Sequence, residues 1–597
     1  MKISKIYSNK KEIFEDIRFK ENFNVIFAKV KKPKDSSKDS HNLGKSILIE
    51  LIDFMLLKSF SRGLFLKDHY STFEDFIFYI EIELNNGNYL TIKRGVVNNT
   101  HISFKSHEDK NQDFREKPDS FWDEVDVTFE DAQEKVNNLL NLDSISPWDY
   151  RKGITYFLRS QGDYRDVFQI EKFSTGKHAY WKPYMAKVLG FNDEIIKQKY
   201  SKDDEIEEKE KFKEQFEKTV SVDPEDFDRL QGVVKIKEKA ISEKESKINM
   251  FNFYENDLEL TKSLANEVEE EISDYNTQMY RTEYDIEKIQ EALNNRLDFN
   301  LNEIKTIYEQ AKIYFSNKFE KEYSELLQFN KELREERFKY LREKLHDLNN
   351  TKKEIDKRLI ELNNKREEIL SIIKDKDSFS KYRKLQSELI NEKTQLLNLR
   401  KELENLNLSD KIQKKINELI EQRDVLVDNT KEMIKQSNVI YNQIREHFNE
   451  IIKFVFNVPA ILSIKINKEG NLEFNANFVK SEEDLTATGE DKGNTYRKIL
   501  CAAFDLSVLM TYSNKSFFRF VYHDGILESL DHRKKILYLK KVKQICSEYN
   551  LQYILTAINH DLPRDENDNI IEFKDNEIIK WLHDSGNEGR LFKMDKF

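Results

Sequence analysis

The longest stretch without a helix breaker is the feature that most constrains what this chain can fold into. In a chain of 597 residues, no glycine lies between Gly232 and Gly470, and no proline lies between Pro224 and Pro459. Because glycine and proline end or kink helices, their absence over so long a stretch predicts extended α-helix. The chain would then consist of a helical middle and two flanking regions.

Apolar residues in the middle of the chain recur with the spacing of a coiled coil. The seam comprises Leu341, Leu345, Leu348, Ile355, Leu359, Leu362 and Ile369, then Leu396, Leu399, Leu403 and Leu406, and after a change of phase Ile412, Ile416 and Leu419. Sustained heptads with charged flanks predict a coiled coil, and the change of phase predicts a local irregularity. The half before residue 297 is less regular, and Pro224 and Gly232 are expected to interrupt its helix.

A reversal of the coil is expected near residues 297–330, where the sequence is rich in aromatic residues and weak in heptads. Two antiparallel arms of about 100 residues each, roughly 150 Å long at the rise of an α-helix, would then occupy residues 199–448. The alternative is one long helix in a parallel homodimer. The antiparallel arrangement is favoured because the two flanking regions carry parts of one site.

Both flanking regions have the pattern of α/β domains. Residues 1–198 contain alternating apolar runs and a turn at 85–88 that predicts a hairpin. Residues 449–597 contain a second predicted hairpin around Gly470 and then alternate between helical and strand patterns. The predicted fold class is therefore α/β, with an N-terminal and a C-terminal lobe joined by the coil.

Composition excludes several classes of protein. The net charge of -11 argues against a globally basic surface for nucleic acid, so any contact with DNA needs a local patch. Cys501 and Cys546 are the only cysteines, which excludes a disulfide scaffold and a C-x-x-C metal motif. No apolar stretch has the length of a membrane span or of a signal peptide core, so we expect a cytoplasmic protein without a membrane partner.

The sequence DSHNLGKS at 39–46 matches the last three positions of the Walker A motif G-x-x-x-x-G-K-[ST], with Asp39 in place of the first glycine. A lysine-rich insertion at 29–38 separates it from the preceding apolar run FNVIFA. Backbone N–H groups around Asn42, Leu43 and Gly44 and the Lys45 ammonium would bind phosphate, and the Ser46 hydroxyl would bind Mg²⁺. The three matching residues also occur by chance in lysine-rich chains.

An apolar run in the C-terminal region, 517–522, ends at His523-Asp524. A carboxylate at the tip of a strand beside a phosphate loop can hold Mg²⁺, which predicts that Asp524 and Ser46 share a metal ion. A buried strand that ends in an aspartate turn is the alternative. The arrangement of Asp524 with Leu530-Asp531 resembles the Walker B motif and D-loop of ABC-type ATPases.

This resemblance extends over essentially the whole chain and implies roles for further residues. Gln161 would be the Q-loop glutamine that contacts the metal ion and the attacking water, and His560 the residue that senses the γ-phosphate. Thr488-Gly489 or Gly493 would open the signature helix, although the literal L-S-G-G is absent. Asp531 would belong to the nucleotide site as well. For Gln161 and His560, an ordinary loop residue remains the alternative.

The chain would combine an N-terminal phosphate loop, a coiled coil that folds back and a C-terminal Walker B motif. This combination is similar to the split heads of SMC-like ABC ATPases, whose cofactors are ATP and Mg²⁺. KDSHNLGKS together with YHDGILESLDHRKK looks like a compact bacterial subgroup found in antiphage defence, including the Lamassu-type SMC-like subunit. That resemblance implies a homodimer that senses double-stranded DNA and controls an effector such as a nuclease. A small accessory subunit is a further partner that it allows. A zinc hook is excluded, because no C-x-x-C lies at the expected reversal.

One departure from the family pattern concerns hydrolysis. Gly525 stands where the catalytic glutamate should follow Asp524, so we expect slow turnover, with Glu528 as the replacement base. Two alternative functions stay open. One is a chromosome-maintenance or DNA-repair ATPase without a dedicated effector, and the other is a non-hydrolysing coiled-coil tether.

Overall fold

The computed structural model describes residues 1–29, 43–170, 177–220, 227–249, 259–294, 317–370, 376–481, 484, 486 and 493–597. The chain divides into two compact units, one containing Met1–Ser201 and Asp424–Phe597 and the other drawn from residues 202–301 and 323–423. The expected boundary at 448 falls inside a helix, α13 (Val439–Phe456). Asn438 begins this helix by accepting a hydrogen bond from the backbone N–H of Tyr441 at 2.9 Å, a start that neither glycine nor proline marks.

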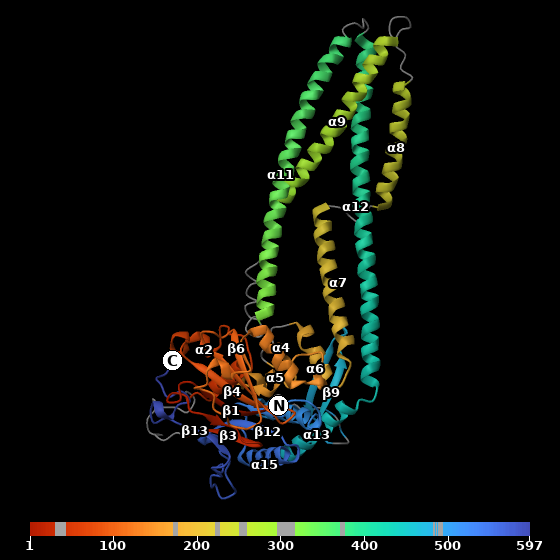
Figure 1. The fold of residues 1–597 in the computed structure, drawn as a ribbon. Coiled ribbons are helices and arrows are strands. Elements are labelled where there is room, and N and C mark those ends of the chain that lie inside the picture. The colour runs from red at the N-terminus through yellow and green to blue at the C-terminus, as the bar shows by residue number, and fades with distance from the viewer. Residues whose placement is uncertain are drawn as a thin grey trace. The chain divides into compact units, whose positions relative to one another are not determined.

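A five-stranded parallel sheet in the first unit combines strands from distant parts of the sequence. Its order is β13-β3-β12-β11-β8, with bounds β3 (Phe23–Lys29), β8 (Leu158–Arg159), β11 (Phe520–His523), β12 (Gln552–Ile558) and β13 (Ile578–His583). β3 pairs with β12 from Phe23↔Tyr553 to Ala28↔Ile558, so red and blue strands lie side by side in Figure 1. Both strands are buried along almost their whole length, as expected when helices cover both faces of a parallel sheet.

An antiparallel sheet and a separate hairpin complete the strands of the first unit. The sheet has the order β2-β1-β4-β5-β6-β7, with bounds β1 (Lys2–Ser8), β2 (Ile17–Arg18), β4 (Ile77–Glu83), β5 (Tyr89–Gly95), β6 (His101–His107) and β7 (Glu124–Thr128). The hairpin pairs β9 (Ala460–Ile466) with β10 (Leu472–Phe478). Both predicted hairpins are confirmed, and their turns contain Gly87 at φ +90° and Gly470 at φ +75°, a backbone region that favours glycine.

Helices pack against these sheets around one continuous hydrophobic core. Besides α13, the first unit contains α1 (Lys45–Met55), α2 (Phe65–Asp68), α3 (Tyr70–Phe73), α4 (Phe129–Leu140), α5 (Tyr150–Phe157), α6 (Lys182–Val188), α14 (Asn494–Thr511) and α15 (His532–Glu548). Short 3₁₀ turns include η3 (Gln161–Arg165) and η8 (Asn559–Asp561). The helix α14 buries an apolar stripe, namely Ile499, Leu500, Ala503, Leu506 and Leu509.

The helical unit pairs its helices in opposite directions. The long helices are α7 (Asp193–Val220), α8 (Phe227–Asn249), α9 (Glu259–Asn294), α11 (Asn317–Leu370) and α12 (Lys376–Lys435), of which α7 begins and α12 ends in the first unit. Lys213 contacts Gln413, Lys244 contacts Glu388, and Lys352 contacts Glu283. As the residue number rises on one side, that of the partner falls, so these pairs are antiparallel. No helix in the described part of the chain is both long and apolar enough to span a membrane.

The helical unit differs from two simple arms in its neighbours. Gly232 lies inside α8, where an interruption was expected, whereas Pro224 lies outside the described residues. The helix α9 contacts α12, through Asp285 and Lys401 among others, so more than two helices pack together there. Residues 297–316 of the expected reversal lie outside the described part of the chain, and α11 has begun by Asn317.

Candidate functional site

The Gly-Lys-Ser of the predicted phosphate loop lies at the start of α1, beyond the end of β3. Gly44 is the N-cap of this helix and has φ +92°, a left-handed conformation that glycine adopts without strain. Lys45 and Ser46 form the first turn, in which backbone N–H groups have no partner within the helix and attract anions. Leu43 is buried against the core, whereas Asn42 and the lysine-rich insertion from residue 30 onward lie outside the described residues.

Asp524 follows β11 directly and contacts the phosphate-loop helix. The Ser46 hydroxyl donates to Asp524 Oδ2 at 2.6 Å, although the two residues are 478 positions apart. Thr556 at the end of β12 donates to Asp524 Oδ1 at 2.5 Å and accepts from the backbone N–H of Gly525 at 3.0 Å. The carboxylate is only 1% exposed, so these two hydroxyls fix both of its oxygens at the edge of the parallel sheet.

Glu528 lies over the position that lacks the usual glutamate. Gly525 has φ +65°, and a Cβ added there would lie 2.8 Å from Glu528 Oε1 and 2.9 Å from Gln161 Nε2. Gln161 donates to Glu528 at 3.0 Å, and the Lys498 ammonium donates to its other oxygen at 2.9 Å. The side chains of Lys498 and Glu528 are 15% and 26% exposed. The carboxylate of Glu528 thus occupies the space that a side chain at 525 would need.

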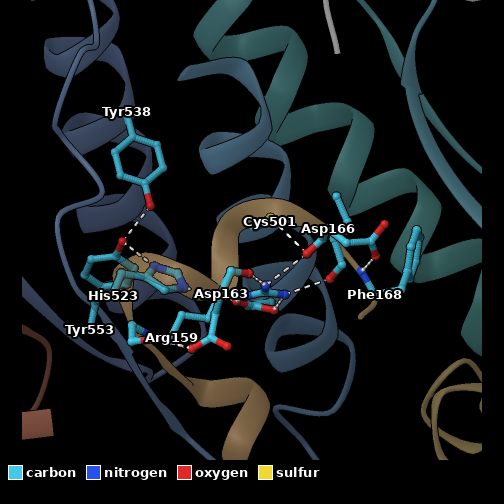
Figure 2. A network of polar contacts seen from close by, with 11 residues as sticks. Arg159, Asp163, Asp166, Phe168, Cys501, His523, Tyr538 and Tyr553 are labelled. Atoms are coloured by element: carbon cyan, nitrogen blue, oxygen red, sulfur yellow. Dashed lines mark hydrogen bonds and ion pairs between the residues drawn. The ribbon is translucent and has the colours of Figure 1, made fainter. Parts of the chain in front are cut away.

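A network of buried polar side chains includes Arg159, His523 and Tyr553 (Figure 2). Arg159 donates from Nε and Nη2 to the two oxygens of Asp505, at 2.5 and 3.0 Å. Asp505 also contacts His523 Nε2 at 3.1 Å, and His523 Nδ1 contacts the Tyr553 hydroxyl at 2.7 Å. Burial lowers the pKa of His523, so the ring is neutral: Nε2–H donates to Asp505, and Nδ1 accepts from Tyr553. Tyr553 in turn accepts from Tyr538 at 2.5 Å.

Arg159 also holds the segment that carries Gln161. Its guanidinium donates to the backbone carbonyls of Asp163 at 2.8 Å and Val167 at 2.7 Å. Burial by itself would lower the pKa of Arg159, but the carboxylate of Asp505 raises it above the ordinary value, so the guanidinium remains charged. The turn around Gln161 is therefore attached to α14 and to the end of β11 through one buried cation.

The other predicted site residues make contacts of their own or lie outside the described chain. The Asp531 side chain is 59% exposed and caps α15 by accepting from the backbone N–H of Arg533 at 3.0 Å. His560 is exposed in η8, and its carbonyl accepts from Lys535 at 3.1 Å. Gly493 is the N-cap of α14, without a side-chain cap. Thr488 and Gly489 lie outside the described residues.

Several polar residues of the site were not predicted. Arg159 and Asp505 each interrupt an apolar run, and two opposite charges in such surroundings are a signal for a buried ion pair. Lys498 precedes Asp505 by two helical turns, so both lie on the same face of α14. Asp561, next to His560, is buried: burial raises its pKa, while a hydrogen bond from the Ile558 N–H and the charges of Lys535 and Lys45 oppose that rise. We see no sequence signal for Asp561.

The site fits a magnesium ion that shares its ligands with phosphate. Among the described residues, no group of three or more His, Cys, Asp or Glu side chains could hold a metal ion by itself. Mg²⁺ is typically bound by one or two protein oxygens together with phosphates and water, and its neighbouring ligands lie roughly 3 Å apart. The oxygens of Ser46 and Asp524, at 2.6 Å, therefore need to separate only slightly to become neighbouring ligands.

Residues 447–596 match a family described as "Uncharacterised protein conserved in bacteria (DUF2326)", which is less than half of the chain. No curated protein matches the sequence.

Solved structures with some similarity are SMC heads. An Smc head domain with a coiled coil and joint from Pyrococcus yayanosii has 14% identity and a TM-score of 0.32, over 93% of this chain and 92% of that chain. An Smc head domain with an extended coiled coil, bound to the C-terminal domain of ScpA, from Pyrococcus furiosus has 12% identity and a TM-score of 0.31, over 94% and 90%. An SmcHead bound to the C-winged helix domain of ScpA has 8% identity and a TM-score of 0.31, over 94% and 90%. With such low scores these likenesses carry no argument, and the following proposal rests on the contacts within this chain.

Proposed function

We propose that the first unit is an ATPase head of the SMC-like ABC type, in which residues from both ends of the chain bind one Mg²⁺-ATP. The observation that carries this proposal is the contact of 2.6 Å between the Ser46 hydroxyl and the Asp524 carboxylate. The first turn of α1 supplies backbone N–H groups and the Lys45 ammonium for the phosphates. Bound Mg²⁺ would neutralise phosphate charge, with Ser46 and Asp524 as its protein ligands.

Glu528 is the residue we assign to activation of water. Its carboxylate lies where a side chain at 525 would otherwise stand, and Gln161 contacts it at 3.0 Å. A general base needs a free lone pair directed at the water, and one oxygen of Glu528 already accepts from Lys498. Turnover would therefore be slow, because a water molecule must compete with two donors for this carboxylate. A nucleotide-dependent switch is compatible with slow turnover.

The family resemblance extends the proposal to the assembly of the protein and to its biological role. In this scheme the open N-terminus of α14 at Gly493 binds the nucleotide of a second copy, and His560 and Asp531 complete the composite site. The homodimer would act in defence in the cytoplasm. It would respond to double-stranded DNA and, together with an accessory subunit, control a nuclease effector. A nuclease gene beside the gene for this chain would support the defence role, and its absence would favour chromosome maintenance or repair.

A non-hydrolysing tether is the second candidate, and Gly525 favours it. In such a protein ATP would bind without being cleaved, and Glu528 would remain paired with Lys498. Phosphate release in a single-turnover assay separates the two candidates. Release that stops when Glu528 is changed to Gln supports the ATPase, and no release from the unchanged protein supports the tether.

Nucleotide binding tests the proposed site directly. We expect the protein to bind one ATP per chain in a Mg²⁺-dependent manner by isothermal titration calorimetry. Lys45→Ala should weaken binding at least tenfold, because a charge-assisted contact with phosphate is lost. Asp524→Asn should reduce the dependence on Mg²⁺. Lys515→Ala, which changes an exposed lysine of the same unit, is the control and should bind ATP normally. If the unchanged protein binds no ATP at millimolar concentration, the proposal is wrong.

A further inference from the structure

A cavity of about 260 Å³ lies at the start of α1, between Leu43–Ile47 and part of the segment 590–597. We call residues 590–597 the closing segment. Its Leu591 N–H donates to the carbonyl of Leu43 at 3.1 Å, directly beside the phosphate-loop glycine. The cavity is thus bounded on one side by the proposed phosphate loop and on the other by a segment more than 500 positions away in the sequence.

Gly44 is in close contact with this closing segment. A Cβ added to Gly44 would lie 2.8 Å from Leu591 Cβ, closer than two such atoms can approach. Glycine is therefore needed at this position for its positive φ and also for the space that Leu591 occupies. The contact fixes the distance between the two walls of the cavity.

Aromatic packing holds the closing segment in place. Phe592 is 2% exposed, and its ring centroid lies 5.0 Å from those of Phe14 and Phe73. The Phe597 ring lies 4.8 Å from Phe73 in an edge-to-face arrangement. The Lys593 N–H also donates to the carbonyl of Ile13 at 2.8 Å. The wall is thus held in place by its packing against the core.

The lining of the cavity is positively charged. Lys45 lies on the side of the phosphate loop, and Arg590 and Lys596 lie on the closing segment, against one carboxylate, Asp595. The whole chain carries a net charge of -11, so this local excess of cations differs in sign from the average surface. A polyanion is the kind of ligand that such a lining attracts.

We infer that the closing segment forms the second wall of the nucleotide pocket and that Arg590 and Lys596 bind the phosphates of ATP opposite Lys45. This inference rests on the proposed function. It is also compatible with the sequence of the phosphate loop, in which Asp39 replaces the first glycine of the motif. Two cations from the other end of the chain would add phosphate contacts, and Arg590 is oriented by donating to the Met594 carbonyl at 2.7 Å.

Paired substitutions test this inference in the full-length protein. Arg590→Gln with Lys596→Gln should weaken the binding of Mg²⁺-ATP, and of inorganic tripolyphosphate, by tenfold or more in calorimetry. Lys593→Gln is the matched control, because this lysine of the same segment pairs with Glu15 and Glu588 and does not line the cavity. Lys596→Gln alone, at an exposed position, should weaken binding severalfold without lowering the melting temperature.

The outcomes separate this inference from the proposed function. If Lys45→Ala loses ATP while the double variant binds as tightly as Lys593→Gln, the closing segment is no phosphate ligand and the ATPase proposal stands. If the unchanged protein binds neither ATP nor tripolyphosphate, both are overturned. Weaker binding by the double variant and by Lys596→Gln, with melting temperatures unchanged, supports the inference.

Discussion

Two sets of three residues join the same three parts of the first unit. One set is buried, and the other, called the exposed set below, is partly exposed. Each set takes one residue from β8 or the turn after it, one from α14, and one from the end of β11 or the loop after it. The buried set is Arg159, Asp505 and His523, and the exposed set is Gln161, Lys498 and Glu528. The side chains of Arg159 and Asp505 are 0% and 1% exposed, whereas those of Lys498 and Glu528 are 15% and 26% exposed.

Because of this difference in exposure, we expect the buried set to position the site and the exposed set to take part in the chemistry. In the interior a charge without a partner is strongly unfavourable, so the buried set can hold only one arrangement. Near the surface water competes for the same groups, and an ion pair contributes little to stability. We therefore assign the buried set to fixing the Gln161 segment, α14 and Asp524 relative to one another. The exposed set can exchange partners when nucleotide and water enter.

The largest expected effect comes from breaking the buried pair. Asp505→Ala leaves the Arg159 guanidinium without its carboxylate and should reduce the free energy of unfolding by about 3–5 kcal/mol. Denaturant unfolding followed by circular dichroism measures this loss. A loss below about 1 kcal/mol, the range of exposed pairs, would remove the distinction between the two sets.

A double substitution sharpens the same test. Arg159→Met combined with Asp505→Leu removes both charges and should be less destabilising than Asp505→Ala, because no buried charge remains. The double-mutant cycle gives the coupling between the two residues. If the double variant is as unstable as the sum of the single ones, the pair is uncoupled and Arg159 acts through its backbone contacts alone.

The next effect concerns chemistry in the exposed set. Glu528→Gln should lower ATP hydrolysis about 100-fold by removing the general base, while ATP affinity stays within twofold of the unchanged protein. Glu548→Gln, an exposed glutamate near the end of α15, is the matched control and should hydrolyse ATP normally. Equal rates for Glu528→Gln and the control would exclude Glu528 from catalysis.

Much of the first unit was predictable, because the local pattern and the tertiary role agree there. The strand ending at Asp524, the hairpins at Gly87 and Gly470 and the buried stripe of α14 follow from period, turn residues and apolar runs. We did not predict Arg159, Asp505 and Lys498 as site residues, because their role depends on which elements become neighbours in the fold. A single charge in an apolar run indicates a buried partner without saying which residue it is.

The helical unit shows where a signal from one residue type fails. The long helices there follow from the heptads and from the scarcity of helix breakers. Gly232 nevertheless lies within α8. One exposed glycine weakens a helix by only about 1 kcal/mol, which packing along a long helix can offset. A single glycine is therefore not a sufficient signal for the end of a long helix.

The smallest expected effect concerns the ion pair of the exposed set. Lys498→Gln removes the contact of 2.9 Å with Glu528 but retains a hydrogen-bond donor, and water can replace the lost charge. The free energy of unfolding should fall by about 0.2–1 kcal/mol, much less than for Asp505→Ala on the same helix. Lys431→Gln, which breaks an exposed pair with Asp428, sets the scale for a pair without a proposed role. If Lys498→Gln destabilised the protein as strongly as Asp505→Ala, both sets would be structural, and Glu528 would lack the freedom that catalysis requires.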